Sequence, residues 1–205
     1  MREDLDSGLV AQYPRLFSER YMPMTHTCMC WGFEHGDGWY NIIKNMCGLI
    51  QGHIDWTREN RARSLRFNRA LRRAIAGNTR DLEYFYSQRD YKTREVRVGV
   101  ISDHVRERMQ QEIAESLFRH VPEACSQVVV NQVKEKFGTL RFYYTGGDDY
   151  VDGVVRMGEG MSAVTCEDCG APGRSRNGGW IRTLCDHHAE ERNYYTEDDN
   201  ESASA

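Results

Sequence analysis

The stretch TCEDCGAPGRSRNGGWIRTLCDHHAEER, residues 165–192, decides how the C-terminal part of this chain folds. It contains two pairs of candidate metal ligands at short spacing, Cys166-x2-Cys169 and Cys185-x2-His188. A C-x2-C pair on a tight turn presents two thiolates to one ion, and Zn²⁺ binds about four such ligands in a tetrahedron. A stretch of this length cannot bury enough apolar surface to hold itself, so we expect the metal to supply its folding free energy.

A hairpin is expected between the two ligand pairs, because Gly173–Arg176 and Trp180–Leu184 flank an Asn-Gly-Gly turn. The residues that follow read as the start of a helix that brings His188 beside the thiols. His187 could replace His188 as the fourth ligand, although the spacing favours His188. Turn, hairpin and ligand-bearing helix together resemble a treble-clef zinc finger. Since all the ligands come from the protein, the pattern predicts a structural Zn²⁺ rather than a catalytic one.

Composition and charge limit the classes of protein to which this chain can belong. Its 205 residues are 40% hydrophobic and 28% charged, which suits a core in one domain with at most a small satellite. The formal net charge of -4 excludes a globally basic nucleic-acid coat. Only local basic patches could therefore serve to bind nucleic acid.

The sequence lacks the marks of membrane insertion or export. No apolar run reaches the roughly 18 residues of a membrane span, and the start MREDLDSGLVAQYPRLF has no apolar signal region. We therefore expect no membrane contact and a cytoplasmic location, in which the 7 cysteines stay reduced. In that setting a cysteine cluster indicates a metal more often than disulfides.

Hydrophobic periodicity predicts an α+β fold with a helical N-terminal half, a small antiparallel sheet and the C-terminal treble-clef-like zinc finger. The expected helices cover residues 39–55, 57–76 and 103–120, and the expected strands cover 95–101, 128–134 and 140–145. A further short helix should begin at Asp152. The predicted domains are an α+β domain at 1–160, a zinc-binding module at 161–195 and an acidic disordered tail at 196–205.

The predicted helix from Arg58 to Arg73 is rich in arginine. At 100° per residue, an apolar side formed by Phe67 and its helical neighbours opposes a basic stripe. The stripe could track phosphates or bind an acidic protein surface, and the alternative is a solvated face. Arginine forms bidentate pairs with phosphate and carboxylate, which favours a binding role. The candidate binding residues are Arg58, Arg61, Arg66, Arg69, Arg72 and Arg73, with Arg63 off the stripe.

A second group of possible ligands lies in the N-terminal part, at His26, Cys28, Cys30 and His35. These residues could in principle hold a second metal ion, but no second pair stands at ligand spacing. Cys47 lies on the apolar face of its predicted helix. We therefore interpret this group as residues of the core, where a buried free cysteine is inert.

The sequence shows no signature of catalysis. It has no P-loop, dinucleotide-binding glycine motif, G-x-S-x-G or H-E-x-x-H. Treble-clef nucleases need a catalytic His on the hairpin, whereas this hairpin carries Arg174, Arg176 and Arg182. The segment QVKEKFGTLRFYY, residues 132–144, mixes basic and aromatic side chains that could stack on bases, but its alternation favours a sheet packed on helices. We predict a binding protein and not an enzyme.

Two segments resemble a group of small proteins encoded by bacteriophages and prophages, namely residues 132–144 and SAVTCEDCGAPGRSRNGGWIRTLCDHH at 162–188. The stretches YPRLF, residues 13–17, and CWGFEHGDGW, residues 30–39, are similar to the start of the same group. The resemblance implies a zinc module and an origin in an infected bacterium, in whose cytoplasm the protein would act.

Small accessory proteins of this origin often bind host machinery. The resemblance therefore implies a zinc-binding accessory protein that binds and inhibits or redirects a host bacterial protein, for example an antiviral defence factor. The alternative is a zinc-finger protein that binds nucleic acid through the basic helix at Arg58–Arg73. The sequence leaves the oligomeric state open.

Overall fold

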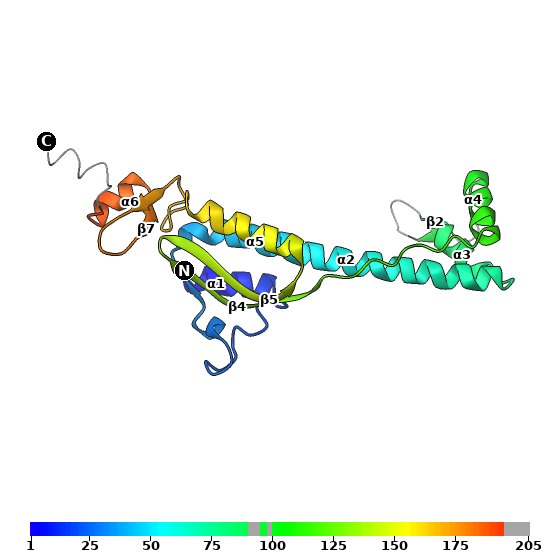
Figure 1. The fold of residues 1–205 in the computed structure, drawn as a ribbon, viewed down its shortest axis with the longest axis horizontal. Helices are drawn as coiled ribbons and strands as arrows, with labels where there is room; N and C mark the ends of the chain where they lie inside the picture. The colour runs from blue at the N-terminus through cyan, green and yellow to red at the C-terminus, as the bar shows by residue number, and fades with distance from the viewer. Residues whose placement is uncertain (90–94, 98–99, 195–205) are drawn as a thin grey trace. The chain divides into compact units, whose positions relative to one another are not determined.

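The computed structural model describes residues 1–89, 95–97 and 100–194, and it has an α+β fold (Figure 1). The chain forms two compact units. The first unit comprises Met1–Ile54 and the chain from Cys125 onward, and the second unit comprises Asp55–Ala124.

The first unit combines short N-terminal elements with a strand pair and two longer helices. In chain order its elements before the C-terminal segment are α1 (Glu3–Gln12), η1 (Cys28–Trp31), β1 (Phe33–Glu34), η2 (Asp37–Trp39), the first part of α2 (Tyr40–Ile75), β4 (Ser126–Lys136), β5 (Thr139–Gly147) and α5 (Asp149–Ser162). The helix predicted to begin at Asp152 begins earlier, because the Asp148 side chain accepts from Val151 N at the N-cap of α5.

A three-stranded sheet in the order β1-β4-β5 forms the β layer of the first unit. The predicted hairpin is confirmed, since β4 and β5 pair antiparallel with Val133 opposite Phe142. Its turn depends on Gly138, which has a φ of +76° and follows Phe137 at φ 53°. Strand β1 pairs parallel to β4, with Phe33 opposite Val133. The sheet is therefore mixed, and not purely antiparallel as predicted.

Helix α5 lies along both the sheet and α2 (Figure 1). Its side chains accept hydrogen bonds from backbone N–H groups on the outer edge of β5. Ser162 Oγ accepts from Leu140 N at 2.8 Å, and Glu159 Oε1 accepts from Phe142 N at 3.0 Å. These two N–H groups of the edge strand are therefore not free to pair with another strand. The core between these layers is continuous and includes Trp39, Ile43, Ile50, Val133, Leu140, Phe142 and Val151, all buried.

The second unit has a smaller core of its own. The later part of α2 buries Phe67 and Leu71 in a cluster with Leu82 and Met109. Its remaining elements are α3 (Arg80–Tyr86), β2 (Gln88–Arg89), β3 (Val96–Arg97) and α4 (Asp103–Ala114), and β2 and β3 pair antiparallel.

Several predicted boundaries in the second unit are wrong or fall partly outside the described residues. The helix predicted at 103–120 ends at Ala114, and Ser116 just beyond it has a positive φ of 53°. The strand predicted at 95–101 is formed only at Val96–Arg97, and residues 98–99 lie outside the described residues. The predicted tail at 196–205 also lies outside them.

The two helices predicted at 39–55 and 57–76 are one continuous helix, α2. No Pro occurs in α2 to interrupt the hydrogen-bond ladder, and the helix continues through Gly52. The predicted domain boundary at residues 160/161 is not followed either, because the ligand-bearing segment belongs to the first unit.

Candidate functional site

Four candidate ligands converge at the C-terminal end of the first unit, and we call this group the metal centre: Cys166, Cys169, Cys185 and His188. The Sγ atoms of Cys169 and Cys185 lie 3.8 Å apart. His188 Nδ1 lies 3.1 Å from Cys185 Sγ and 3.6 Å from Cys166 Sγ. A tetrahedral ion with metal–sulfur bonds of about 2.3 Å has sulfur–sulfur edges of roughly 3.8 Å. These side chains could therefore hold one metal ion.

Local backbone structure positions the ligands. Gly170 closes the first turn with a φ of +78°, and its N–H donates to Cys166 O at 2.9 Å. Cys185 is the N-cap of α6 (Asp186–Glu191), whose first turn carries His188. Between the two pairs, β6 (Arg174–Arg176) and β7 (Arg182–Leu184) form the predicted antiparallel hairpin.

The structure distinguishes the two adjacent histidines. The His188 imidazole is turned toward the thiols and its side chain is 22% exposed, whereas the His187 side chain is 72% exposed. His187 Nε2 instead lies 3.5 Å from Glu191 Oε1. The geometry therefore agrees with His188 as the fourth ligand.

The thiols of the metal centre differ in their electrostatic surroundings. Burial acts to raise the pKa of Cys166, but hydrogen bonds from the backbone of Cys185, Cys169 and Asp168 outweigh it, so that the pKa is lowered. For Cys169, desolvation and hydrogen bonds with the neighbouring thiols raise the pKa to about 11. Binding a cation would remove the proton from each thiol.

A layer of ion pairs surrounds the metal centre. Arg182 Nη2 lies 2.9 Å from Glu167 Oε2 and 3.1 Å from Asp168 Oδ1, and Arg192 Nε lies 2.8 Å from Asp168 Oδ2. Coulombic attraction to Glu167 opposes the effect of burial and raises the pKa of Arg182. The two acids stand between Cys166 and Cys169, so the arginine fixes the ligand turn.

The other hairpin arginines are also engaged within the module. Arg176 is buried and forms an ion pair with Asp186, and Arg174 Nη2 lies 3.3 Å from the same carboxylate. Hydrogen bonding to Arg176 lowers the pKa of Asp186. The hairpin arginines Arg174, Arg176 and Arg182 thus all form ion pairs within the module.

The module is docked on the N-terminal part of the first unit. Gly36 N donates to Glu167 Oε1 at 3.0 Å, and Gly38 N donates to Glu167 O at 2.7 Å. Trp39 Nε1 donates to Thr165 O at 2.8 Å. The HGDGW segment, residues 35–39, therefore anchors the module. The sequence did not reveal this role, because the partners of the segment lie about 130 residues further along the chain.

The N-terminal His and Cys residues do not form a metal site among the described residues. His26, Cys28, Cys30 and His35 appear in none of the ligand groups found there. The interpretation of this group as core residues holds for His35, which is buried, and is wrong for His26 and Cys28, which are exposed. Burial lowers the pKa of His35 to about 4, although its Nδ1 lies 2.7 Å from Gly36 O. Cys47 is fully buried in the core, as predicted, and this burial raises the pKa of its thiol.

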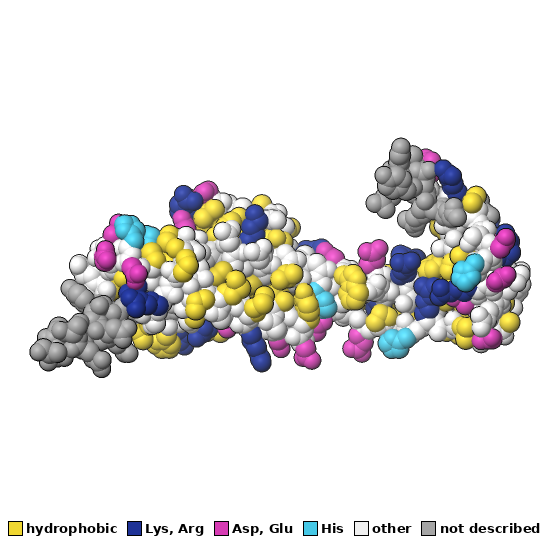
Figure 2. Space-filling model, turned by 90° about the horizontal axis from the view of Figure 1, so that it is seen from above, with side chains coloured by type: hydrophobic (Ala, Val, Ile, Leu, Met, Phe, Trp, Pro, Cys, Tyr) yellow, Lys and Arg dark blue, Asp and Glu magenta, His cyan; other side chains and the backbone are white. Residues whose placement is uncertain are grey.

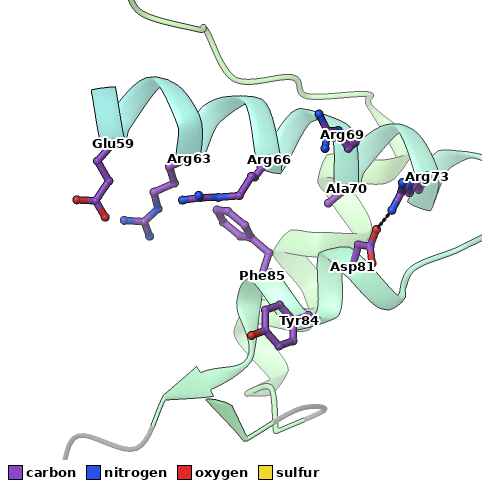
Figure 3. A pocket seen from close by; sticks show the side chains of 9 residues that line it. All are labelled: Glu59, Arg63, Arg66, Arg69, Ala70, Arg73, Asp81, Tyr84 and Phe85. Carbon is purple, nitrogen blue, oxygen red and sulfur yellow. Dashed lines mark hydrogen bonds and ion pairs between the residues drawn. The ribbon is translucent and has the colours of Figure 1, made fainter. Parts of the chain in front are cut away.

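An open cavity of about 800 Å³ lies in the second unit, between α2 and α3 (Figure 3). We call it the arginine groove. Arg63 and Arg66 extend beside the ring of Phe85, with Arg63 Cζ 5.8 Å from the ring centroid, while Arg73 pairs with Asp81. Its lining residues are Glu59, Arg63, Arg66, Arg69, Ala70, Arg73, Asp81, Tyr84 and Phe85.

The predicted basic stripe is divided by this groove. Arg66, Arg69 and Arg73 line it together with Arg63, which the sequence had placed off the stripe, whereas Arg58 is not among the lining residues. The other two arginines of the stripe contact residues of the second unit. Arg61 Nη1 donates to Pro122 O at 2.9 Å, and Arg72 Cζ lies 5.5 Å from the Phe118 ring centroid. Figure 2 shows Lys and Arg side chains gathered beside exposed hydrophobic ones on the second unit.

No protein-family model matches the chain, and no curated protein and no solved structure matches it. In the part of the chain that the structure describes, no helix combines the length and apolar character needed to cross a membrane. Fold and sites together define an α+β protein with a four-ligand candidate metal centre and a separate arginine groove.

Proposed function

We propose that this chain is a non-enzymatic zinc-binding protein that acts by binding an acidic partner in the arginine groove. Three thiolates and one imidazole form the donor set of structural Zn²⁺ sites, and they leave no position for a substrate. The hairpin and the short ligand-bearing helix support a treble-clef-like zinc finger. In this proposal the zinc holds the fold and the groove holds the partner.

The charge distribution of the chain is the observation that carries the proposal. Residues 55–124 contain 15 Lys+Arg and 11 Asp+Glu, a formal charge of +4, whereas the rest of the chain contains 12 and 20, a formal charge of −8. Among the described residues, four guanidinium groups of the positive unit line one groove together with two carboxylates. Such a concentration of one sign attracts an oppositely charged surface and speeds its association.

A host bacterial protein is the partner that we favour. Arginine and aromatic residues dominate the binding energy of protein interfaces, and Tyr84 and Phe85 lie beside the arginines. The resemblance of the sequence to phage-encoded small proteins supports an accessory protein that acts in the cytoplasm of a bacterial host. Such a protein would inhibit or redirect its target, for example an antiviral defence factor.

Affinity capture with matched charge variants tests this function. We expect the tagged full-length chain to retain one host protein in stoichiometric amount from a bacterial lysate, and the double variant Arg66→Glu/Arg69→Glu to lose it. Arg106→Glu is the control, because Arg106 is exposed on α4 of the same unit and does not line the groove. Equal capture by all three chains would refute the groove as the binding surface.

Binding of single-stranded nucleic acid is the second candidate function. Aromatic side chains beside a row of cations can stack bases while the cations track phosphates, and Tyr84 and Phe85 occupy that position in the groove. A mobility shift with single-stranded oligonucleotides tests it, with an affinity that falls steeply as salt rises. The absence of a shift at low salt would leave the protein partner as the only candidate.

A further inference from the structure

Three potential ligands from distant parts of the sequence converge elsewhere in the first unit. His53 lies on α2, Cys125 immediately precedes β4, and Asp148 is the N-cap of α5. One ligand atom of each lies within 4.8 Å of the other two, the same limit that the metal centre satisfies. None of these residues contributes to the metal centre or the arginine groove.

The two polar side chains are held in place before any ion binds. Asp148 Oδ1 accepts from Val151 N at 3.3 Å as the cap of α5, which leaves Oδ2 directed at His53 Nε2 at 2.8 Å. The His53 ring is stacked on Tyr150, with centroids 4.2 Å apart and an interplanar angle of 23°. A cap and an aromatic stack therefore fix the carboxylate and the imidazole, as second-shell contacts do in metal sites.

The third side chain adds the donor that selects the class of ion. Cys125 is 5% exposed, and its Sγ lies 3.4 Å from Ser126 O. A buried thiol gains from giving its proton up to a cation and binding as thiolate. A set with one sulfur, one nitrogen and one oxygen suits a borderline transition ion such as Zn²⁺ and does not suit Ca²⁺ or Mg²⁺.

We infer that His53, Cys125 and Asp148 form a second site for Zn²⁺, independent of the metal centre. The ion would take the place of the proton shared by His53 and Asp148, and their ligand atoms would separate to roughly 3.3 Å, the edge of a tetrahedron with bonds of about 2.0 Å. Three protein ligands leave the fourth position to water. The Asp148 side chain is 38% exposed, so water and the ion reach the site from solvent.

Metal stoichiometry of the full-length chain tests this site. After incubation with excess Zn²⁺ and removal of unbound metal, we expect two zinc ions per wild-type chain and one per Cys125→Ser chain. Asp148→Asn is the second variant, because the amide oxygen can still cap α5 while the charged ligand is lost, and we expect its site to bind at least about tenfold more weakly in competition with a chromophoric chelator. Cys47→Ala is the control, since Cys47 is a buried cysteine that belongs to none of the ligand groups among the described residues, and this variant should retain two ions.

Substitution with Co²⁺ adds a readout of the ligand atoms. A thiolate–Co²⁺ charge-transfer band that loses intensity in Cys125→Ser would place sulfur at the second site. One zinc ion per wild-type chain, or two ions retained by both Cys125→Ser and Asp148→Asn, would overturn the inference. Neither result bears on the arginine groove, whose partner is tested by capture with the groove variants.

Discussion

At the scale of single residues, Arg182 stabilises the turn that carries Cys166 and Cys169. Its partners Glu167 and Asp168 have side chains that are only 5% and 13% exposed. Removing the arginine would leave the Glu167 carboxylate without its cation in a poorly solvated place and Asp168 with Arg192 as its remaining cation, which costs far more than the loss of a surface ion pair.

We expect Arg182→Ala to destabilise the holo protein by about 3 kcal/mol, as breaking a buried ion pair does. The control is Arg174→Ala, in which both partners of the lost pair are largely exposed, and its effect should stay within about 0.5 kcal/mol. Denaturant unfolding of both variants in the presence of Zn²⁺ measures the difference. Equal stabilities would show that the Arg182 pairs do not support the ligand turn.

His35 should titrate far below an ordinary histidine. Burial lowers its pKa from 6.5 to about 4, so the unfolded chain binds the proton more tightly than the folded chain. The neutral His35 side chain therefore makes its full contribution to the free energy of unfolding above pH 6.5. This contribution is lost as pH falls toward 4, by a total on the order of 3 kcal/mol. An NMR titration of its ring protons gives the pKa, and a midpoint near 6.5 would contradict the burial shown by the structure.

The residues of the metal centre were predictable because their spacing is local. Ligand pairs separated by two intervening residues, on a turn and at a helix start, bring the cysteines and the histidine together whatever the rest of the chain does. The contacts of Gly36 and Gly38 with Glu167 were not predictable, since they depend on how distant segments pack. The second ligand group at His53, Cys125 and Asp148 was missed for the same reason.

At the scale of elements, α2 shows why one helix was predicted as two. Its apolar residues up to Ile54 belong to the core of the first unit, and those from Phe67 onward belong to the core of the second. At 100° per residue, the second apolar face is rotated by roughly a third of a turn from the first. The periodicity of apolar residues is therefore interrupted after Ile54, although the helix itself continues.

Two glycines of α5 should respond oppositely to substitution. Gly158 is packed against Met46 of α2, and an added Cβ would collide with that side chain, whereas an added Cβ at Gly153 meets open space. We expect Gly158→Ala to destabilise the protein by about 1–3 kcal/mol through overpacking. Gly153→Ala should stabilise it by about 0.5–1 kcal/mol through helix propensity. Thermal unfolding measures the stability of both variants relative to wild type. A Gly158→Ala variant more stable than wild type would contradict the packing of α5 on α2.

The β4–β5 hairpin was predictable, because Gly138 in the turn and the alternation on either side are local signals. Strand β1 has only two residues, and it is defined by its parallel pairing with β4 rather than by its own sequence. Short strands of this kind have no periodicity to detect.

At the scale of the whole molecule, the chain leaves the first unit at Asp55 and returns to it at Cys125. Such an interrupted unit was not predictable from the sequence, because its closure depends on contacts between segments far apart. The difference in charge between the two units was already present in the sequence, but it became visible only when the structure set their boundaries.

Removal of the ion from the metal centre should act on one part of the molecule. With a chelator added to the Cys125→Ser chain, which lacks the second inferred site, we expect faster hydrogen exchange in β6, β7 and α6, because in our proposal the folding free energy of this segment comes from its ion. Helices α3 and α4 have a separate core and should exchange as before. Mass spectrometry of peptides from the full-length chain resolves the segments, and an equal rise in both would show that the metal does not act locally.

In our proposal Cys166, Cys169, Cys185 and His188 bind one structural Zn²⁺. Zinc-edge X-ray absorption on the Cys125→Ser chain reports the ligands of this ion alone, because that variant disables the second inferred site. We predict one zinc per chain, surrounded by three sulfurs at about 2.3 Å and one nitrogen at about 2.0–2.1 Å. A first shell of oxygen and nitrogen alone, or well under one zinc per chain, would contradict the account.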